Sequence, residues 1–169
     1  MHVIHAHFER LSEIAVPILL GEIGVYVLWS GMAKARPSYI GEGNILNRLV
    51  THHDRFAKPF DGFATVLSRE GIPWQRAKAD ATIVEAMLLA VANDTDRMPS
   101  TNVAPGKLRD LDDILRSHRK VRINVTGLDP LRPPEECPKL RARKCIVLCF
   151  DQDEDFRIRH DWRRRRIRK

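Results

Sequence analysis

GVYVLWSGMAKARPSYIGEGNILNRLVTHH, residues 24–53, is the stretch that decides the predicted fold. Its first six residues are rich in β-branched and aromatic side chains, which is typical of a buried strand. Residues 38–41 predict a second short strand, joined to the first by a long loop. Asn44 can then cap a helix by accepting a hydrogen bond from one of its first N–H groups. We expect that helix to run to about Phe56.

The chain on either side of this stretch adds further elements. The spacing of apolar residues predicts a short amphipathic helix at residues 5–16, which Pro17 would end. A third strand is expected at about residues 63–67. A strongly apolar helix is expected to follow, from Asp80 as its N-cap to about Asn93.

The pattern changes in the last third of the chain. Leucines within residues 108–115 mark one more helix, and the alternation in residues 121–125 (VRINV) predicts a strand. Residues 144–150 (KCIVLCF) and 156–162 (FRIRHDW) are expected to form a hairpin. Helices and strands that do not alternate regularly favour the α+β class.

Length and composition limit the classes of protein to consider. The chain has 169 residues, of which 43% are hydrophobic, enough to bury the core of about one domain. The most apolar stretch, residues 15–29, is interrupted by Pro17, Glu22 and two glycines, and is too short to span a bilayer. No signal-peptide pattern opens the chain, and its three cysteines do not make a disulfide framework. We therefore expect no membrane segment and a cytoplasmic location.

The positive charge is concentrated at the C-terminal end. Residues 139–169 hold 12 Lys and Arg against 5 Asp and Glu, so this stretch accounts for the whole formal charge of +7. Such a block favours contact with nucleic-acid phosphates, because each neutralised phosphate releases condensed counterions. In the second arm of the predicted hairpin, Arg157 and Arg159 alternate with apolar residues, so one face would display arginines. A solvated, solubilising tail is the alternative explanation.

The helix expected after Asn44 has two distinct faces. Because each residue advances about 100° around the axis, His52 and Arg55 lie close to Arg48 around the helix. The residues expected to face the core are Leu46, Leu49, His53 and Phe56. A solvated polar face is the ordinary explanation for Arg48 and His52.

The apolar helix of residues 81–92 (ATIVEAMLLAVA) contains one charged residue, Glu85. A helix that is hydrophobic all round is generally buried. A lone buried carboxylate is costly unless an arginine or a metal compensates its charge. Glu85 is therefore predicted to form a structural ion pair or to bind a hard cation such as Mg²⁺, which prefers oxygen ligands.

The triplets GVY (24–26) and YIG (39–41) together resemble the paired signature of the GIY-YIG nuclease family. The resemblance continues in order along the chain: Arg48 lies in the helix after YIG, His52 follows one turn later, and Glu85 lies in the next, apolar helix. Each triplet alone is a weak signal. The ordered set is hard to obtain by chance.

The resemblance extends over residues 23–102, about half of the chain. Asn102 is similar to a late asparagine of the family that would support the site, and Asn93 is the other candidate for this position. The resemblance implies a small three-stranded antiparallel sheet flanked by helices. The strands and helices expected from the residues themselves occur in a compatible order.

The resemblance also implies roles for the site residues. One tyrosine activates the attacking water, and we favour Tyr39, with Tyr26 beside it. Arg48 would stabilise negative charge on the phosphoryl transition state, and a tyrosine pKa would be lowered by Arg48 and a metal. Glu85 would hold a single divalent cation, Mg²⁺ or Mn²⁺. His52 would position the water or the phosphate.

The sequence thus predicts a Mg²⁺-dependent DNA endonuclease that hydrolyses phosphodiester bonds. Three segments are expected: an N-terminal helical extension (1–22), a GIY-YIG-like nuclease domain (23–118) and a basic, β-rich C-terminal appendage (119–169). The appendage would grip the nucleic-acid backbone, which gives position rather than sequence specificity. The residues expected to contact nucleic acid are Arg55, Arg157, Arg159, Arg163, Arg164, Arg165 and Arg166.

Other interpretations of the sequence stay open. The main alternative is a nucleic-acid-binding protein of the same fold that does not cleave, and another is a structural interaction domain with a solubilising tail. A homodimer is an open expectation, since two strand cuts favour two active sites. Zinc is disfavoured: His2, His5 and His7 lack accompanying cysteines or carboxylates, and Cys145 and Cys149 share one face of an apolar strand.

Overall fold

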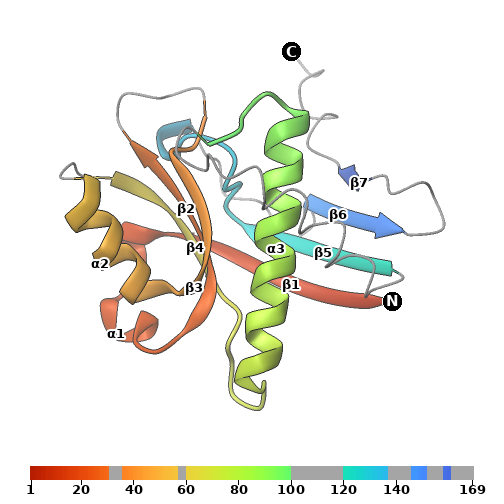
Figure 1. Cartoon of the computed structure of the whole chain (residues 1–169), viewed down its shortest axis with the longest axis horizontal. Helices are drawn as coiled ribbons and strands as arrows, with labels where there is room; N and C mark the ends of the chain where they lie inside the picture. The colour runs from red at the N-terminus through yellow and green to blue at the C-terminus, as the bar shows by residue number, and fades with distance from the viewer. Residues whose placement is uncertain (31–35, 57–59, 100–119, 137–145, 152–157, 161–169) are drawn as a thin grey trace.

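The computed structural model describes residues 1–30, 36–56, 60–99, 120–136, 146–151 and 158–160. Within these ranges, seven strands form one mixed sheet in the order β3-β2-β4-β1-β5-β6-β7 (Figure 1). Neighbouring strands are antiparallel except for β1 and β5, which are parallel. The strands are β1 (His2–Arg10), β2 (Ile23–Ser30), β3 (Tyr39–Asn44), β4 (Phe60–Val66), β5 (Lys120–Gly127), β6 (Ile146–Asp151) and β7 (Ile158–His160).

Helices accompany this sheet, so the class is α+β, as predicted. The long helix α3 crosses one face of the sheet, and α2 lies beside the end formed by β3 and β2 (Figure 1). None of the helices in the described ranges combines the length and the hydropathy needed to cross a membrane. The helices are η1 (Leu11–Glu13, 3₁₀), α1 (Val16–Leu19), α2 (Ile45–Phe56), α3 (Trp74–Asp94) and η2 (Pro134–Glu136, 3₁₀).

The N-terminal segment is a strand, and the predicted helix at residues 5–16 is wrong. In β1, Ile4, Ala6 and Phe8 are buried and alternate with exposed neighbours, which is the two-residue period of a strand. β1 pairs with β5 over seven residues and with β4 at its last two. Pairing on both sides outweighs the weak helical spacing of this segment, because both neighbours supply backbone hydrogen bonds.

The predicted three-stranded sheet is also too small. β3, β2 and β4 do form an antiparallel trio, in which Tyr26 lies opposite Gly41 on one side and Ala64 on the other. β1 then joins this trio to β5, β6 and β7 in one sheet. The three predicted segments therefore all contribute strands to the same sheet, while their limits as domains stay a prediction.

The predictions for the C-terminal strands are confirmed where the structure describes them. β5 contains the predicted residues 121–125, and its Val121, Ile123 and Val125 are buried while the residues between them are not. β6 and β7 pair antiparallel, as a hairpin requires. The helix predicted at residues 108–115 lies outside the described residues.

The two longer helices differ in how well their ends were predicted. α2 begins as expected: the N–H of Asn47 donates to Oδ1 of Asn44 at 3.1 Å, so Asn44 caps the helix. α3 begins at Trp74 after Pro73, six residues before Asp80. Proline suits the start of a helix because the missing N–H has no partner there in any case.

The two faces of β2 carry two separate hydrophobic clusters. Alternate residues of the strand (Ile23, Val25, Val27 and Trp29) join a large cluster that includes α3. Tyr26 and Leu28 point to the other side and join a smaller cluster with Ile45, at the start of α2. This alternation follows from the two-residue period of a strand, and it places Tyr26 on the side of the sheet where α2 packs.

Candidate active site

Three aromatic rings from β2, β3 and α2 lie together at one end of the sheet. The rings of Tyr26 and Tyr39 are stacked, with centroids 6.0 Å apart and planes 17° from parallel. The ring centroid of His52 is 4.4 Å from that of Tyr39 and 5.6 Å from that of Tyr26. Nε2 of His52 is 3.1 Å from the phenolic oxygen of Tyr26, within hydrogen-bond distance. The fold thus brings together three of the predicted site residues.

The register of the strands explains why the two tyrosines meet. Tyr39 pairs with Leu28, and Gly41 pairs with Tyr26, so Tyr26 and Tyr39 are diagonal neighbours on one face. A Cβ on Gly41 would lie 2.4 Å from Cε1 of Tyr39 and 2.6 Å from the phenolic oxygen of Tyr26. Only glycine leaves room here for both rings, which gives the last residue of YIG a physical role.

The first glycine of the GVY triplet has a different role. A Cβ on Gly24 would lie 1.9 Å from the backbone oxygen of Thr65 in β4 and 2.7 Å from Cδ1 of Ile45 in α2. Gly24 therefore lets β4 and α2 approach β2 closely. Close approach of α2 brings His52 within reach of Tyr26.

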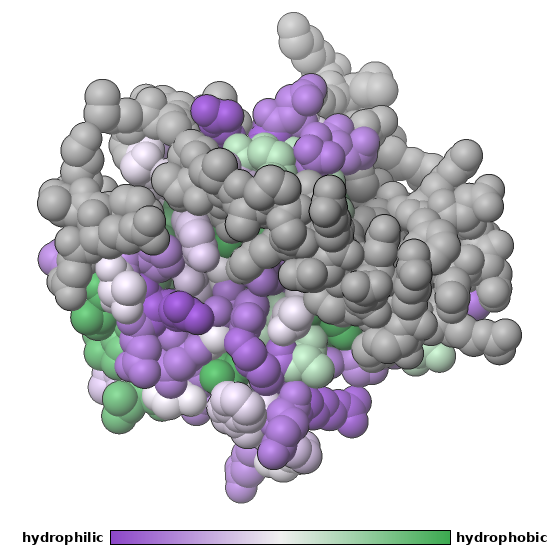
Figure 2. Space-filling model, in the orientation of Figure 1, coloured by the Kyte–Doolittle hydropathy of each residue, from purple (hydrophilic) through white to green (hydrophobic). Residues whose placement is uncertain are grey.

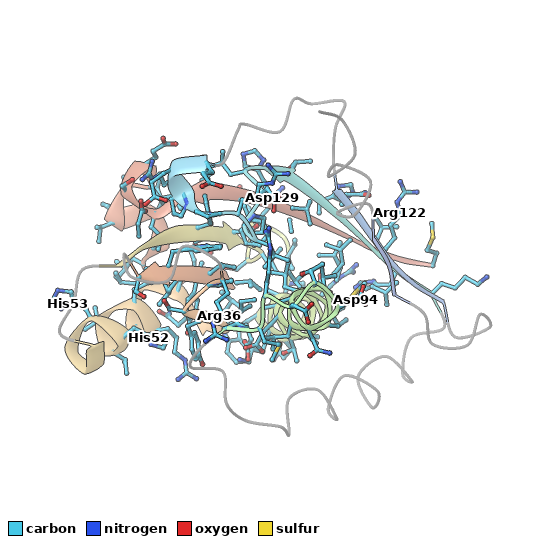
Figure 3. All side chains as sticks on the ribbon, turned by 90° about the horizontal axis from the view of Figure 1, so that it is seen from above. Arg36, His52, His53, Asp94, Arg122 and Asp129 are labelled. Atoms are coloured by element: carbon cyan, nitrogen blue, oxygen red, sulfur yellow. The ribbon has the colours of Figure 1, made fainter. Side chains whose placement is uncertain are left out.

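His52 does not lie on a solvated polar face of α2, as the helix spacing predicted. It is only 6% exposed, whereas its neighbour His53, predicted to face the core, is exposed. In Figure 3, His52 lies on the side of α2 toward the strands and His53 on the outer side. The phenolic hydroxyl of Tyr26 supplies a polar partner inside this cluster, so a histidine is accommodated at a position that the predicted core face of α2 did not include.

Arg48 lies near the tyrosines, as the resemblance implied. Its side chain is exposed and passes over β3, where a Cβ on Gly43 would lie 3.5 Å from Nε of Arg48. Its positive charge also acts to lower the pKa of Tyr26. Arg48 therefore adds positive charge next to the ring cluster on the solvent side.

The pKa of Tyr26 is nevertheless raised well above its ordinary value of about 10. Burial is the main cause, because it disfavours the charged phenolate, and the negative charge that Tyr39 would carry acts in the same direction. The opposing effect of Arg48 is smaller. The expectation of a lowered tyrosine pKa is therefore wrong for Tyr26, which stays a neutral phenol at physiological pH.

This shift predicts a loss of stability in alkaline solution. Up to about pH 10, both the folded and the unfolded chain keep the Tyr26 proton; above it, only the unfolded chain releases the proton, so stability falls as pH rises. The slope for this one group reaches about 1.4 kcal/mol per pH unit. Denaturant unfolding between about pH 9 and pH 11 should show a smaller decline for Tyr26→Phe than for wild type. Equal declines would contradict the raised pKa.

Glu85 lies in the buried part of α3. Its side chain is 5% exposed, and all residues from Ile83 to Leu89 are buried. The negative charge of Glu85 contributes to the raised pKa of Tyr26, so the carboxylate lies within electrostatic reach of the ring cluster. A fifth predicted site residue thus belongs to the same region of the fold.

The donor set of this region fits Mg²⁺ rather than a metal that needs several protein ligands. No group of three or more His, Cys, Asp or Glu is arranged to hold a metal ion in the part of the chain described here. Mg²⁺ commonly keeps several waters and binds through one or two carboxylates together with substrate phosphates. The single carboxylate of Glu85 is therefore enough for a Mg²⁺ ion of this kind. His2 has a carboxylate partner that the sequence did not reveal, since its Nε2 lies 2.7 Å from a carboxylate oxygen of Asp80.

Two charged residues of this region were missed by the sequence analysis. Lys78 of α3 forms a salt bridge with Glu42 of β3. Glu42 also contributes to the raised pKa of Tyr26. The available signal was spacing: Lys78 precedes Glu85 by seven residues, or two helical turns, so both lie on one side of α3.

For the remaining predicted residues, the structure gives at most the element to which each belongs. Asn102, Arg157 and Arg163–Arg166 lie outside the described residues. Arg55 belongs to α2 and Arg159 to β7. Asn93, the other candidate for the late asparagine, is exposed near the end of α3.

The candidate active site therefore consists of Tyr26, Tyr39 and His52 in contact, with the charges of Arg48 and Glu85 close by. These residues come from β2, β3, α2 and α3, and the first and last are 59 positions apart in the sequence. No protein-family model, curated protein or solved structure matches this chain.

Proposed function

We propose that this protein is a Mg²⁺-dependent DNA endonuclease that hydrolyses phosphodiester bonds. The observation that carries the proposal is the meeting of Tyr26, Tyr39 and His52 beside the charges of Arg48 and Glu85. These are five of the six residues implied by the GIY-YIG resemblance. A packed core alone does not need two stacked tyrosines, a buried histidine and a buried carboxylate in one region, since each polar group adds a desolvation cost.

Tyr39 is the proposed base that takes a proton from the attacking water. It is less buried than Tyr26, and its ring centroid lies 4.4 Å from that of His52 and 6.0 Å from that of Tyr26. Tyr26, kept neutral by burial, can donate its phenolic proton and so fix the orientation of His52. Arg48 would stabilise the charge that develops on the phosphoryl oxygens.

Glu85 is the residue proposed to hold Mg²⁺ or Mn²⁺. The ion, when bound, supplies positive charge that stabilises the phosphate and the departing oxygen. The burial of Glu85 matters for the protein's own contribution, because electrostatic interactions are stronger where water is excluded.

The basic C-terminal stretch is proposed to bind the DNA backbone. It carries the whole formal charge of +7, which favours phosphate contact. The proposed contacts in this stretch are Arg157, Arg159, Arg163, Arg164, Arg165 and Arg166, and Arg55 of α2 is proposed to join them. Such contacts would hold the DNA without reading its sequence.

Incubation with supercoiled plasmid tests the function directly. We expect wild-type protein with Mg²⁺ to give nicked or linear DNA, EDTA to stop the reaction, and Tyr39→Phe to slow it by about 10²-fold, because general-base catalysis contributes at least that much. The tyrosine variant also serves as a control for a contaminating nuclease, whose activity it would leave unchanged.

A second outcome would favour the non-cleaving alternative. If the wild-type protein binds DNA but cuts neither plasmid, branched nor single-stranded substrates with Mg²⁺ or Mn²⁺, the endonuclease proposal is wrong. The site would then belong to a nucleic-acid-binding protein that does not cleave.

A further inference from the structure

Two cationic side chains from different helices approach the backbone of Gly43 in β3. A Cβ placed on Gly43 would lie 3.5 Å from Nε of Arg48 in α2 and 3.9 Å from Nζ of Lys78 in α3. The two nitrogens are therefore no farther apart than the sum of these distances. Like charges held this close repel each other unless an anion compensates them.

Gly43 itself is buried, but the two cationic side chains that lie over it reach the solvent. β3 ends the strand order, so its outer edge has no neighbouring strand among the described residues. Gly43 has φ of +129°, a conformation that residues other than glycine rarely adopt, so the strand carries no side chain of its own here and Arg48 and Lys78 can lie close to its backbone. Arg48 is exposed and the Lys78 side chain is 35% exposed. Hydrophilic residues gather on this face between α2 and the first half of α3 (Figure 2).

One carboxylate accompanies the two cations. Glu42, the residue before Gly43, forms a salt bridge with Lys78, and its side chain is 15% exposed. The salt bridge holds the lysine over β3 rather than letting it extend into solvent. Arg48, Lys78 and Glu42 together carry a net charge of +1, which is suited to an anion.

We infer that Arg48 and Lys78 together bind one phosphate group of the nucleic-acid backbone over Gly43, where the phosphate competes with Glu42 for Lys78. This inference rests on the proposed function and names a further substrate-binding residue for it. An arginine offers a planar pair of donors and a lysine a compact charge, a combination that suits the several oxygens of a phosphate. The tyrosine pair lies next to this position, since Gly41 of the same strand is in contact with both rings.

The competing explanation is purely structural: the Lys78–Glu42 salt bridge ties α3 to β3 and has no ligand. The two explanations predict different effects of the variant Glu42→Gln on the affinity for nucleic acid. If Lys78 binds phosphate, removing the carboxylate removes both a competitor and a repulsive charge, so nucleic-acid binding becomes tighter. If the salt bridge is only structural, Glu42→Gln and Lys78→Ala lower stability alike and neither changes binding.

Salt-dependent binding of the full-length protein separates these explanations. The probe is a fluorescently labelled DNA duplex in EDTA, where cleavage does not interfere. Lys78→Ala should weaken binding by about 10-fold at low salt and reduce the slope of log Kd against log salt by about 0.9, the loss of one phosphate contact. Arg76→Ala is the matched control, because Arg76 is exposed on the same helix and its loss changes the net charge equally. We expect it to change Kd less than about twofold, because two residues along a helix turn Arg76 to another side of α3, where its exposed charge is screened.

The outcomes distinguish this inference from the proposed function. Tighter binding by Glu42→Gln, about twofold or more, together with the reduced slope of Lys78→Ala, supports the phosphate site; the figure is the order of effect expected for removing one nearby charge. If the slope of log Kd against log salt is the same for Lys78→Ala and Arg76→Ala, the inference is wrong. The proposed function is unaffected in that case, provided that the wild-type protein binds DNA. A wild-type protein that binds neither duplex nor single-stranded DNA overturns both.

Discussion

Replacing Glu85 by glutamine is expected to lower Mg²⁺-dependent plasmid cleavage by about 10³-fold while DNA binding persists. A metal that stabilises transition-state charge contributes several kcal/mol, and each 1.36 kcal/mol corresponds to a factor of ten. Glutamine keeps the shape of the side chain but not the negative charge that holds the cation. Glu85 is 5% exposed, so a change in shape would also disturb the packing of α3.

The same variant decides between the two explanations of the buried carboxylate. If Glu85 binds Mg²⁺, the ion should raise the Tm of wild type but not that of Glu85→Gln, because a ligand stabilises only the folded state that binds it. Glu9→Gln is the control, since Glu9 is exposed on β1 and its loss removes the same charge. A Glu85→Gln protein that is less stable, yet cleaves normally per folded molecule, would show that Glu85 serves a structural ion pair.

Local signals in the sequence were sufficient for the elements around the site. The β-branched and aromatic run of β2 and the cap at Asn44 each specify a local conformation, and both are confirmed. The same holds for the alternation of β5. Where the conformation of a segment depends on its neighbours in the fold, the local sequence pattern does not predict it. β1 shows this, because its few apolar residues fit two periods and only pairing with β4 and β5 selects the strand.

The residues that the fold brings together in the candidate site were singled out in the sequence, but their environment was not predicted. Tyr26, Tyr39, Arg48, His52 and Glu85 follow from their order in the sequence. The burial of His52 and the raised pKa of Tyr26 depend on how closely α2 approaches β2, which Gly24 permits and spacing does not reveal.

The glycine of the YIG triplet offers a test of whether the ring cluster itself matters for function. Gly41→Ala would place a methyl group 2.4 Å from Cε1 of Tyr39 and 2.6 Å from the phenolic oxygen of Tyr26. These atoms are at the far ends of side chains, so the rings can turn aside while the strands stay paired. We expect a stability loss of about 1–3 kcal/mol, as for other overpacked sites. We also expect a loss of plasmid cleavage of about 10²-fold or more, as large as that from removing the base.

Gly71→Ala is the matched control for this experiment. Gly71 has φ of +81°, so alanine is strained there by about 1 kcal/mol, but a Cβ would meet no atom within 4 Å. Gly71→Ala thus lowers stability without disturbing the two rings. At a temperature below the Tm of both variants, we expect it to cleave plasmid as fast as the wild-type protein does. Cleavage by Gly41→Ala at the level of Gly71→Ala would mean that the rings need not be stacked for catalysis. Loss of cleavage in Gly41→Ala alone, with circular dichroism unchanged, would tie the chemistry to the geometry of Tyr26 and Tyr39.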